Sequence, residues 1–168
     1  VDSLGDITIS NDGATILDEI EVTHPAAKMM VNLAKAQDHE VGDGTTTAVV
    51  LAGAMLEQAR GLLDKEIHAT TIIEGYRRAL EQAKKIIEEA AEKIDLKDRE
   101  TLIKVAETAM RSKLVAGERR HLAEIAVDAV LKVKEERDGK NVVDIDRIKI
   151  VKKQGKSIKE TQLVSGIV

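Results

Sequence analysis

Two glycines, one carboxylate and three hydroxyls stand together where a helix should begin, in the run Gly42-Asp43-Gly44-Thr45-Thr46-Thr47. The first turn of a helix carries unpaired N–H groups and a partial positive charge, so it attracts phosphate. Glycine lets the backbone approach a ligand closely, threonine hydroxyls can bond phosphate oxygens, and an aspartate can hold Mg²⁺ through oxygen. The chemistry indicated is the binding of a nucleoside triphosphate.

A simpler interpretation of the same run stays open at this point. Gly-Asp-Gly followed by threonine is also a good turn and N-cap for an ordinary helix. The run is not a Walker A loop, because the required glycine spacing is absent and no lysine follows the second glycine. It is not a dinucleotide-binding fingerprint either, because no third glycine stands at the right place and no strand clearly precedes it.

Composition narrows the function classes. The 168 residues suffice for one domain or two small ones, and 43% hydrophobic residues support a core that must be aliphatic, since Tyr76 is the single aromatic residue. A net charge of −4 argues against a nucleic-acid-binding protein, which would carry an excess of basic residues. The absence of cysteine excludes disulfides and thiolate chemistry. No apolar run reaches the length of a membrane span and no secretory signal opens the chain, so a cytoplasmic protein is expected. The 33% of charged residues favours a thermophilic source.

The expected fold class is mostly α, a helical bundle with a small β-hairpin followed by an α+β segment. Alternation over residues 5–10, the turn signal Asn11-Asp12-Gly13 and a return over 14–17 predict the hairpin. Apolar spacing then predicts helices at about 26–37, with Pro25 at the first helical position, 45–64, and 71–93, with Thr71 and Glu74 as a capping box. The first of these helices should be largely buried.

Two more helices are expected at about 98–111 and 118–136. The buried stripe predicted for the helix at 98–111 consists of Leu102, Val105, Ala106 and Ala109. Strands are expected around Ile148–Val151 and at Leu163–Val168. Because the chain would then begin and end inside strands, it is expected to be a piece of a larger protein. The helix at 45–64 is apolar on most sides and needs several neighbours, so exposed apolar surface and self-association are expected.

Several segments together resemble the group II chaperonins, the family of the archaeal thermosome. The resemblance rests first on residues 11–17 (NDGATIL), 24–29 (HPAAKM) and 41–53 (VGDGTTTAVVLAG). It continues through Glu74-Gly75-Tyr76 and 112–117 (SKLVAG) to 155–157 (GKS) and 163–167 (LVSGI), and so covers nearly the whole chain.

The resemblance implies a subunit of a double-ring ATPase that encloses and folds other proteins. Residues 1–97 would be the first segment of an equatorial, ATP-binding domain, and residues 98–168 the first segment of an intermediate domain. The implied cofactors are ATP and Mg²⁺. The implied partners are other chaperonin subunits in the ring and, through an apical domain that this chain lacks, unfolded protein clients; neither nucleic acid nor a membrane is expected.

The resemblance also implies roles for individual residues. Asp43 matches the Mg²⁺-binding aspartate of the family, and Gly44, Thr45, Thr46 and Thr47 match residues that wrap the phosphates. Asp12 matches an acidic residue near the γ-phosphate and the attacking water; on its own it would be interpreted as a turn residue. Lys113, with Ser112 beside it, falls in a loop that resembles the family's nucleotide-sensing loop. A solvated loop lysine is the simpler interpretation of Lys113.

The resemblance implies that the second halves of the two domains, including the aspartate that acts as general base, lie outside this chain. Phosphoryl transfer depends on positioning and charge stabilisation, so the chain alone should not hydrolyse ATP appreciably. The alternative function is a non-catalytic fragment that acts only as an assembly or interaction module.

Overall fold

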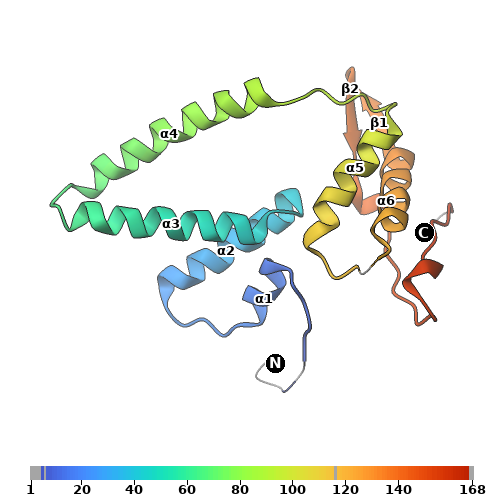
Figure 1. The fold of residues 1–168 in the computed structure, drawn as a ribbon, viewed down its shortest axis with the longest axis horizontal. Helices are drawn as coiled ribbons and strands as arrows, with labels where there is room; N and C mark the ends of the chain where they lie inside the picture. The colour runs from blue at the N-terminus through green and yellow to red at the C-terminus, as the bar shows by residue number, and fades with distance from the viewer. Residues whose placement is uncertain (1–4, 6, 116, 167–168) are drawn as a thin grey trace. The chain divides into compact units, whose positions relative to one another are not determined.

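The computed structural model describes residue 5 and residues 7–115 and 117–166. The chain divides into two compact units, Val1–Lys93 and Ile94–Val168, which are described separately. The first unit is helical and the second combines helices with a two-stranded sheet, in agreement with the expected mostly α fold that ends in an α+β segment (Figure 1). In the part of the chain that the structure describes, no helix is long and apolar enough to cross a membrane.

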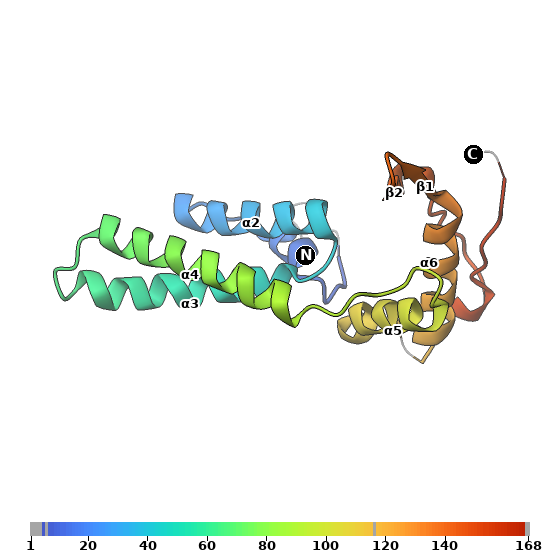
Figure 2. The same ribbon diagram turned by 90° about the horizontal axis from the view of Figure 1, so that it is seen from above.

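The first unit contains the helices α1 (Gly13–Glu19), α2 (Pro25–Val41), α3 (Thr45–Leu63) and α4 (Ala69–Ala90). Pro25 opens α2, as predicted, because its fixed φ suits the first helical turn. Helices α2 and α3 pack side by side and are joined by the three residues 42–44 (Figures 1 and 2). The Tyr76 hydroxyl of α4 donates a hydrogen bond of 2.6 Å to the Met55 carbonyl of α3. The loop of residues 42–44 therefore connects two helices that pack as an antiparallel pair, and α1 and α4 pack against this pair.

The predicted hairpin over residues 5–17 is wrong. Residues 7–12 are extended without strand pairing, and residues 13–19 form α1 instead of a returning strand. The physical reason is local: the Asp12 carboxylate accepts hydrogen bonds from the backbone N–H and the hydroxyl of Thr15, which is an N-cap rather than a hairpin turn. Asp6 of the expected first strand lies outside the described residues.

Helices α2 and α4 also differ from expectation. Helix α2 buries only Ala34, and Met29 is 71% exposed, so the expected burial of this helix is wrong for this chain. Helix α4 begins two residues early because the His68 side chain accepts from the Thr70 N–H. The expected capping box at Thr71 is therefore not the start of the helix.

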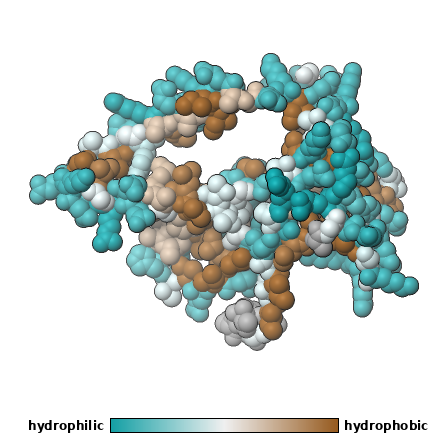
Figure 3. All heavy atoms as spheres, viewed as in Figure 1, coloured by the Kyte–Doolittle hydropathy of each residue, from teal (hydrophilic) through white to brown (hydrophobic). Residues whose placement is uncertain are grey.

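Apolar side chains on α3 are exposed, as the sequence predicted for an incomplete core, and apolar side chains on α4 are exposed as well. Val50, Leu51 and Leu56 on α3 are about 60% exposed, and Ile86 and Ile87 on α4 are similarly open. Figure 3 shows hydrophobic atoms at the surface along both helices.

The second unit contains α5 (Arg99–Ala109), α6 (Arg119–Val133), and the strands β1 (Lys134–Arg137) and β2 (Lys140–Val143). Its core consists of Ile103, Ala123 and Val127, where α5 packs on α6. The stripe predicted for α5 omitted Ile103, which is fully buried, and included Val105, which is 52% exposed. Three short 3-10 helices, Met110–Ser112, Ile145–Arg147 and Ile158–Glu160, complete this unit.

The strands of the second unit lie elsewhere than the sequence suggested. Strands β1 and β2 pair antiparallel, with Lys134 opposite Val143, through a turn in which Asp138 and Gly139 both have positive φ. That conformation suits a two-residue hairpin turn, so the chain leaves α6 at Val133 and not at Glu136. The expected strand at Ile148–Val151 is not formed, and neither is one at 163–166; Ile167 and Val168 lie outside the described residues.

Ion pairs join α5 to α6. Arg99 binds Asp128 through two hydrogen bonds of 2.8 and 2.9 Å, and Arg120 binds Glu100 through two of 2.8 and 2.7 Å. The Arg120 guanidinium holds the pKa of Glu100 below its ordinary value, and Arg99 does the same for the pKa of Asp128. These two-pronged contacts fix the register of the helix pair at its surface.

Candidate functional site

The loop that carries Asp43 is built by two glycines in the left-handed region. Gly42 ends α2 with φ of 74°, and its N–H donates to the Gln37 carbonyl at 3.2 Å; Gly44 precedes α3 with φ of 75°. Residues with a Cβ rarely adopt this conformation, so both positions favour glycine. The Gln37 side-chain amide donates to the Asp43 carbonyl at 2.8 Å. The loop is therefore held at the end of one helix and the start of the next.

The first turn of α3 has free backbone N–H donors, because no side chain caps the start of this helix. No side chain caps the helix at Gly44, and the first intrahelical bond runs from the Ala48 N–H to the Gly44 carbonyl at 2.9 Å. Within the described ranges, the N–H groups of Thr45, Thr46 and Thr47 have no acceptor. Thr45 is buried, whereas Thr46 and Thr47 are exposed. The arrangement is a donor-rich helix start that is open to an anion.

Asp43 is exposed beside these donors. Its Oδ1 accepts a hydrogen bond of 2.9 Å from the Gly44 N–H, which orients the carboxylate next to the helix start. Among the described residues, no group of three or more His, Cys, Asp or Glu side chains could hold a metal ion by itself. Asp43 could thus supply one oxygen ligand to a hard cation whose remaining ligands are water and phosphate, the arrangement that Mg²⁺ usually adopts.

The turn Asn11-Asp12-Gly13 lies against the start of α3. A Cβ on Gly13 would stand 3.1 Å from both the Thr45 hydroxyl oxygen and the Thr46 amide nitrogen, and would meet the Thr46 hydroxyl as well. The backbone of α1 can approach this closely because Gly13 has no side chain. The structure therefore brings Asp12, which caps α1, into the neighbourhood of the Thr45–Thr47 turn.

Ser112 and Lys113 belong to the second unit. Ser112 is the exposed last residue of the 3-10 helix, and the half-buried Lys113 follows it with its N–H donating to the Met110 carbonyl at 3.1 Å. The connector runs on to Gly117, and Ala116 within it lies outside the described residues. A role for Ser112 and Lys113 beside a phosphate stays a prediction.

Sequence reasoning gave no role to Gly13 or Gln37. Gly13 was assigned to a hairpin turn, although an aspartate followed three residues later by threonine is also a helix N-cap signal. Gln37 carried no local signal, because its partner is a backbone carbonyl six residues away whose position depends on two left-handed glycines. Both residues help to shape the loop, but neither supplies a hydrogen-bond donor to the candidate anion site.

Comparison with known proteins gives a consistent result along the whole chain. The sequence profile of the TCP-1/cpn60 chaperonin family matches residues 1–168. Over all 168 residues the chain is 57% identical to thermosome subunit beta of Desulfurococcus mucosus, 55% to the thermosome subunit of Methanopyrus kandleri and 54% to thermosome subunit beta of Thermoplasma acidophilum. It covers 34%, 31% and 31% of those proteins, so it spans about a third of their length.

Proposed function

This chain belongs to the TCP-1/cpn60 chaperonin family, and on that premise we propose that it supplies the phosphate- and magnesium-binding part of the nucleotide site of a chaperonin subunit. The observation that carries the proposal is the uncapped start of α3, where the N–H groups of Thr45, Thr46 and Thr47 have no acceptor in the described part of the chain. A phosphate would satisfy these donors and would favour the positive end of the helix.

The residues present fit a magnesium nucleotide. The first turn of α3 and the exposed Thr46 and Thr47 hydroxyls would hold the phosphates, and the Asp43 carboxylate would hold Mg²⁺. The absent Cβ of Gly13 leaves room for the turn that carries Asp12 to lie against the same donors. When bound, Mg²⁺ would neutralise phosphate charge.

Asp12 has two tasks in this proposal. Its Oδ2 accepts from the Thr15 N–H at 3.1 Å and from the Thr15 hydroxyl at 3.0 Å, so the carboxylate is held in one orientation at the start of α1. Held there, it would act on the water that attacks the terminal phosphate. In the whole subunit, Ser112 and Lys113 would respond to the same phosphate.

The activity of the whole subunit is part of the proposal. We infer an ATP-driven folding chaperonin that assembles with other subunits into a double ring and takes unfolded proteins as clients through a domain outside this chain. The 168 residues alone would bind the nucleotide weakly and would not turn it over, because positioning and charge stabilisation of phosphoryl transfer need the rest of the site.

A second function is supported by the exposed apolar faces of α3 and α4, where Val50, Leu51 and Ile87 are more than half exposed. These faces favour an assembly module that buries them against another chain. This function requires no nucleotide.

Calorimetry with ATP separates the two functions. With Mg²⁺ present, Asp43→Ala should raise the dissociation constant at least about tenfold, the effect expected when a charge-assisted contact is lost. With EDTA present, the same substitution should have little effect, whereas Thr46→Val should weaken binding under both conditions. The matched control is Asp38→Ala, which removes an exposed carboxylate from α2. Equal affinity of the wild type and Asp43→Ala in Mg²⁺ would refute the magnesium role, and no binding by the wild type would favour the assembly module.

A further inference from the structure

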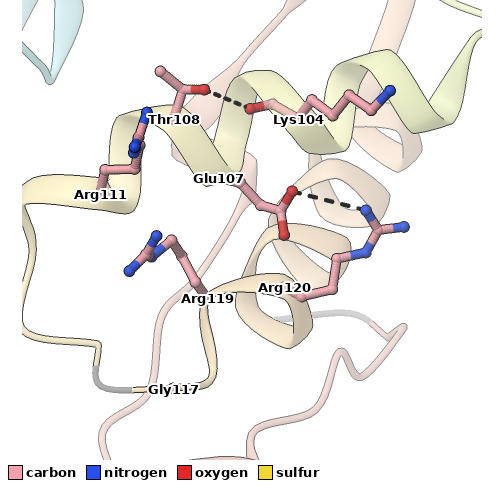
Figure 4. A pocket seen from close by; sticks show the side chains of 7 residues that line it. All are labelled: Lys104, Glu107, Thr108, Arg111, Gly117, Arg119 and Arg120. Carbon is pink, nitrogen blue, oxygen red and sulfur yellow. Dashed lines mark hydrogen bonds and ion pairs between the residues drawn. The ribbon is translucent and has the colours of Figure 1, made fainter.

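The second unit contains a pocket of about 550 Å³ where α5 ends and α6 begins (Figure 4). Its lining carries four basic side chains and one acidic side chain, together with a hydroxyl and a glycine: Lys104, Arg111, Arg119 and Arg120, then Glu107, Thr108 and Gly117. Gly117 leaves open space beside it, because a Cβ there would meet no atom within 4 Å. The pocket is therefore a cationic hollow with an open side.

The nearby carboxylates already have cationic partners, because Glu118 pairs with Lys159 and three others face Arg120. Arg120 binds Glu100 through two hydrogen bonds and Glu124 through one of 2.9 Å, and its Nη1 lies 3.8 Å from the Glu107 carboxylate. Arg111 and Arg119, by contrast, make no ion pair within the described ranges. Figure 4 shows both side chains on the same side of the pocket, that of Arg111 beside Thr108 and that of Arg119 at the start of α6, while the Lys104 ammonium points away.

Arg119 carries a further sign that an acceptor is lacking. Its Nε is buried and has no hydrogen-bond partner. A buried donor on a charged group costs free energy when it is left unpaired, and two unpaired guanidinium groups lining one hollow repel each other. The adjacent start of α6 adds partial positive charge, because no side chain caps that helix.

We propose that this pocket binds a phosphoryl-type oxyanion between Arg111 and Arg119. Each guanidinium presents parallel donors that match two oxygens, so two arginines together match an anion with three or more oxygens. A phosphoryl group offers three oxygens, and its negative charge neutralises the two guanidinium groups. A carboxylate has only two oxygens, so it can make a two-pronged contact with only one arginine at a time. None of the residues that line this pocket is among those assigned to the proposed nucleotide site.

Calorimetry of the 168-residue chain with magnesium-free pyrophosphate at low salt tests the site. Arg111→Gln and Arg119→Gln should each raise the dissociation constant at least about tenfold, as expected for a lost charge-assisted contact. Arg77→Gln, which removes an exposed arginine from α4, is the matched control and should change it less than about twofold. Thr46→Val should leave the part of this binding that depends on Arg111 and Arg119 unchanged, which separates it from any site on α3.

Two further measurements keep the test sharp if a glutamine variant unfolds. Arg119→Lys keeps the positive charge but removes the paired N–H donors of the guanidinium, so it too should weaken pyrophosphate binding. In ¹⁵N NMR spectra of the wild type, the Nε–H signal of Arg119 should shift as pyrophosphate is added.

The proposal is overturned if millimolar pyrophosphate gives no heat, if Arg111→Gln and Arg119→Gln bind like the wild type, or if Thr46→Val abolishes the binding. Tighter binding of a hexaglutamate peptide than of pyrophosphate would also overturn it, because the pocket would then recognise carboxylates. Binding of ATP in the glutamine variants, with pyrophosphate binding lost, supports two separate sites.

Discussion

Replacing Gly13 with alanine tests the contact on which the shape of the candidate site depends. The added Cβ would lie 3.1 Å from the Thr45 hydroxyl oxygen and the Thr46 amide nitrogen. The Thr46 hydroxyl, which it would also meet, can rotate away, but the Thr46 amide belongs to the backbone of α3. The helices must therefore move apart, and Gly13→Ala should destabilise the first unit.

The magnitude follows from two opposing terms. Overpacking a close contact costs about 1–3 kcal/mol, whereas alanine is favoured over glycine in a helix by up to about 1 kcal/mol. The net effect is a loss of about 1 kcal/mol, which corresponds to a melting temperature about 4–8 °C lower for a unit of this size. The expected sign is opposite to that of an ordinary glycine-to-alanine change in a helix.

Gly53→Ala is the matched control, because Gly53 lies in α3 and a Cβ there would meet no atom within 4 Å. Gly53→Ala should raise the melting temperature of the first unit. The unfolding transition that shifts in Gly53→Ala therefore identifies the transition of the first unit, and the same transition is measured in Gly13→Ala. Circular dichroism at 222 nm measures both. A melting temperature of Gly13→Ala equal to or above that of Gly53→Ala would refute the close packing of α1 on α3.

Two other predictions concern the contacts that hold each unit. Tyr76→Phe removes the hydroxyl that bonds α4 to α3, so the free energy of unfolding of the first unit should fall by about 1 kcal/mol, and an unchanged urea midpoint would contradict that bond. In the second unit, the folded-state pKa values of Glu100 and Asp128 are lowered by arginines, so their contribution to stability is present above the ordinary carboxyl pKa and is lost as pH falls through the lowered values. The melting temperature of this unit should therefore fall between about pH 5 and 2, and it should fall less in Arg120→Gln; equal pH profiles for both proteins would show that the Glu100 pair contributes nothing.

Local signals in the sequence predicted the long helices well. Pro25 opens α2 and α3 starts after Gly44, as predicted, whereas α2 runs past its expected end at about residue 37 and stops only at the left-handed Gly42. These residues act through their own backbone preferences, which neighbours in space do not change. The same local chemistry predicted the candidate loop at Asp43.

Where two local signals compete, the pattern alone does not decide. Asn11-Asp12-Gly13 is typical of a hairpin turn, yet Thr15 gives the Asp12 carboxylate two donors and the helix forms. The contact of Gly13 with Thr46 joins residues far apart in the chain, so no periodicity reveals it. The expected strand at Ile148–Val151 would need a partner strand, and the described part of the chain pairs only β1 with β2.

The hydrogen bond from Gln37 to the Asp43 carbonyl spans only six residues. The other hydrogen bonds of this loop also join residues that are close in the sequence, from Gly42 to Gln37, from Gly44 to Asp43 and from Ala48 to Gly44. Closing short segments costs little chain entropy, so such contacts form early in folding. Because a ribosome releases the chain from its N-terminal side, this loop can take its shape while α4 and the second unit are still being synthesised.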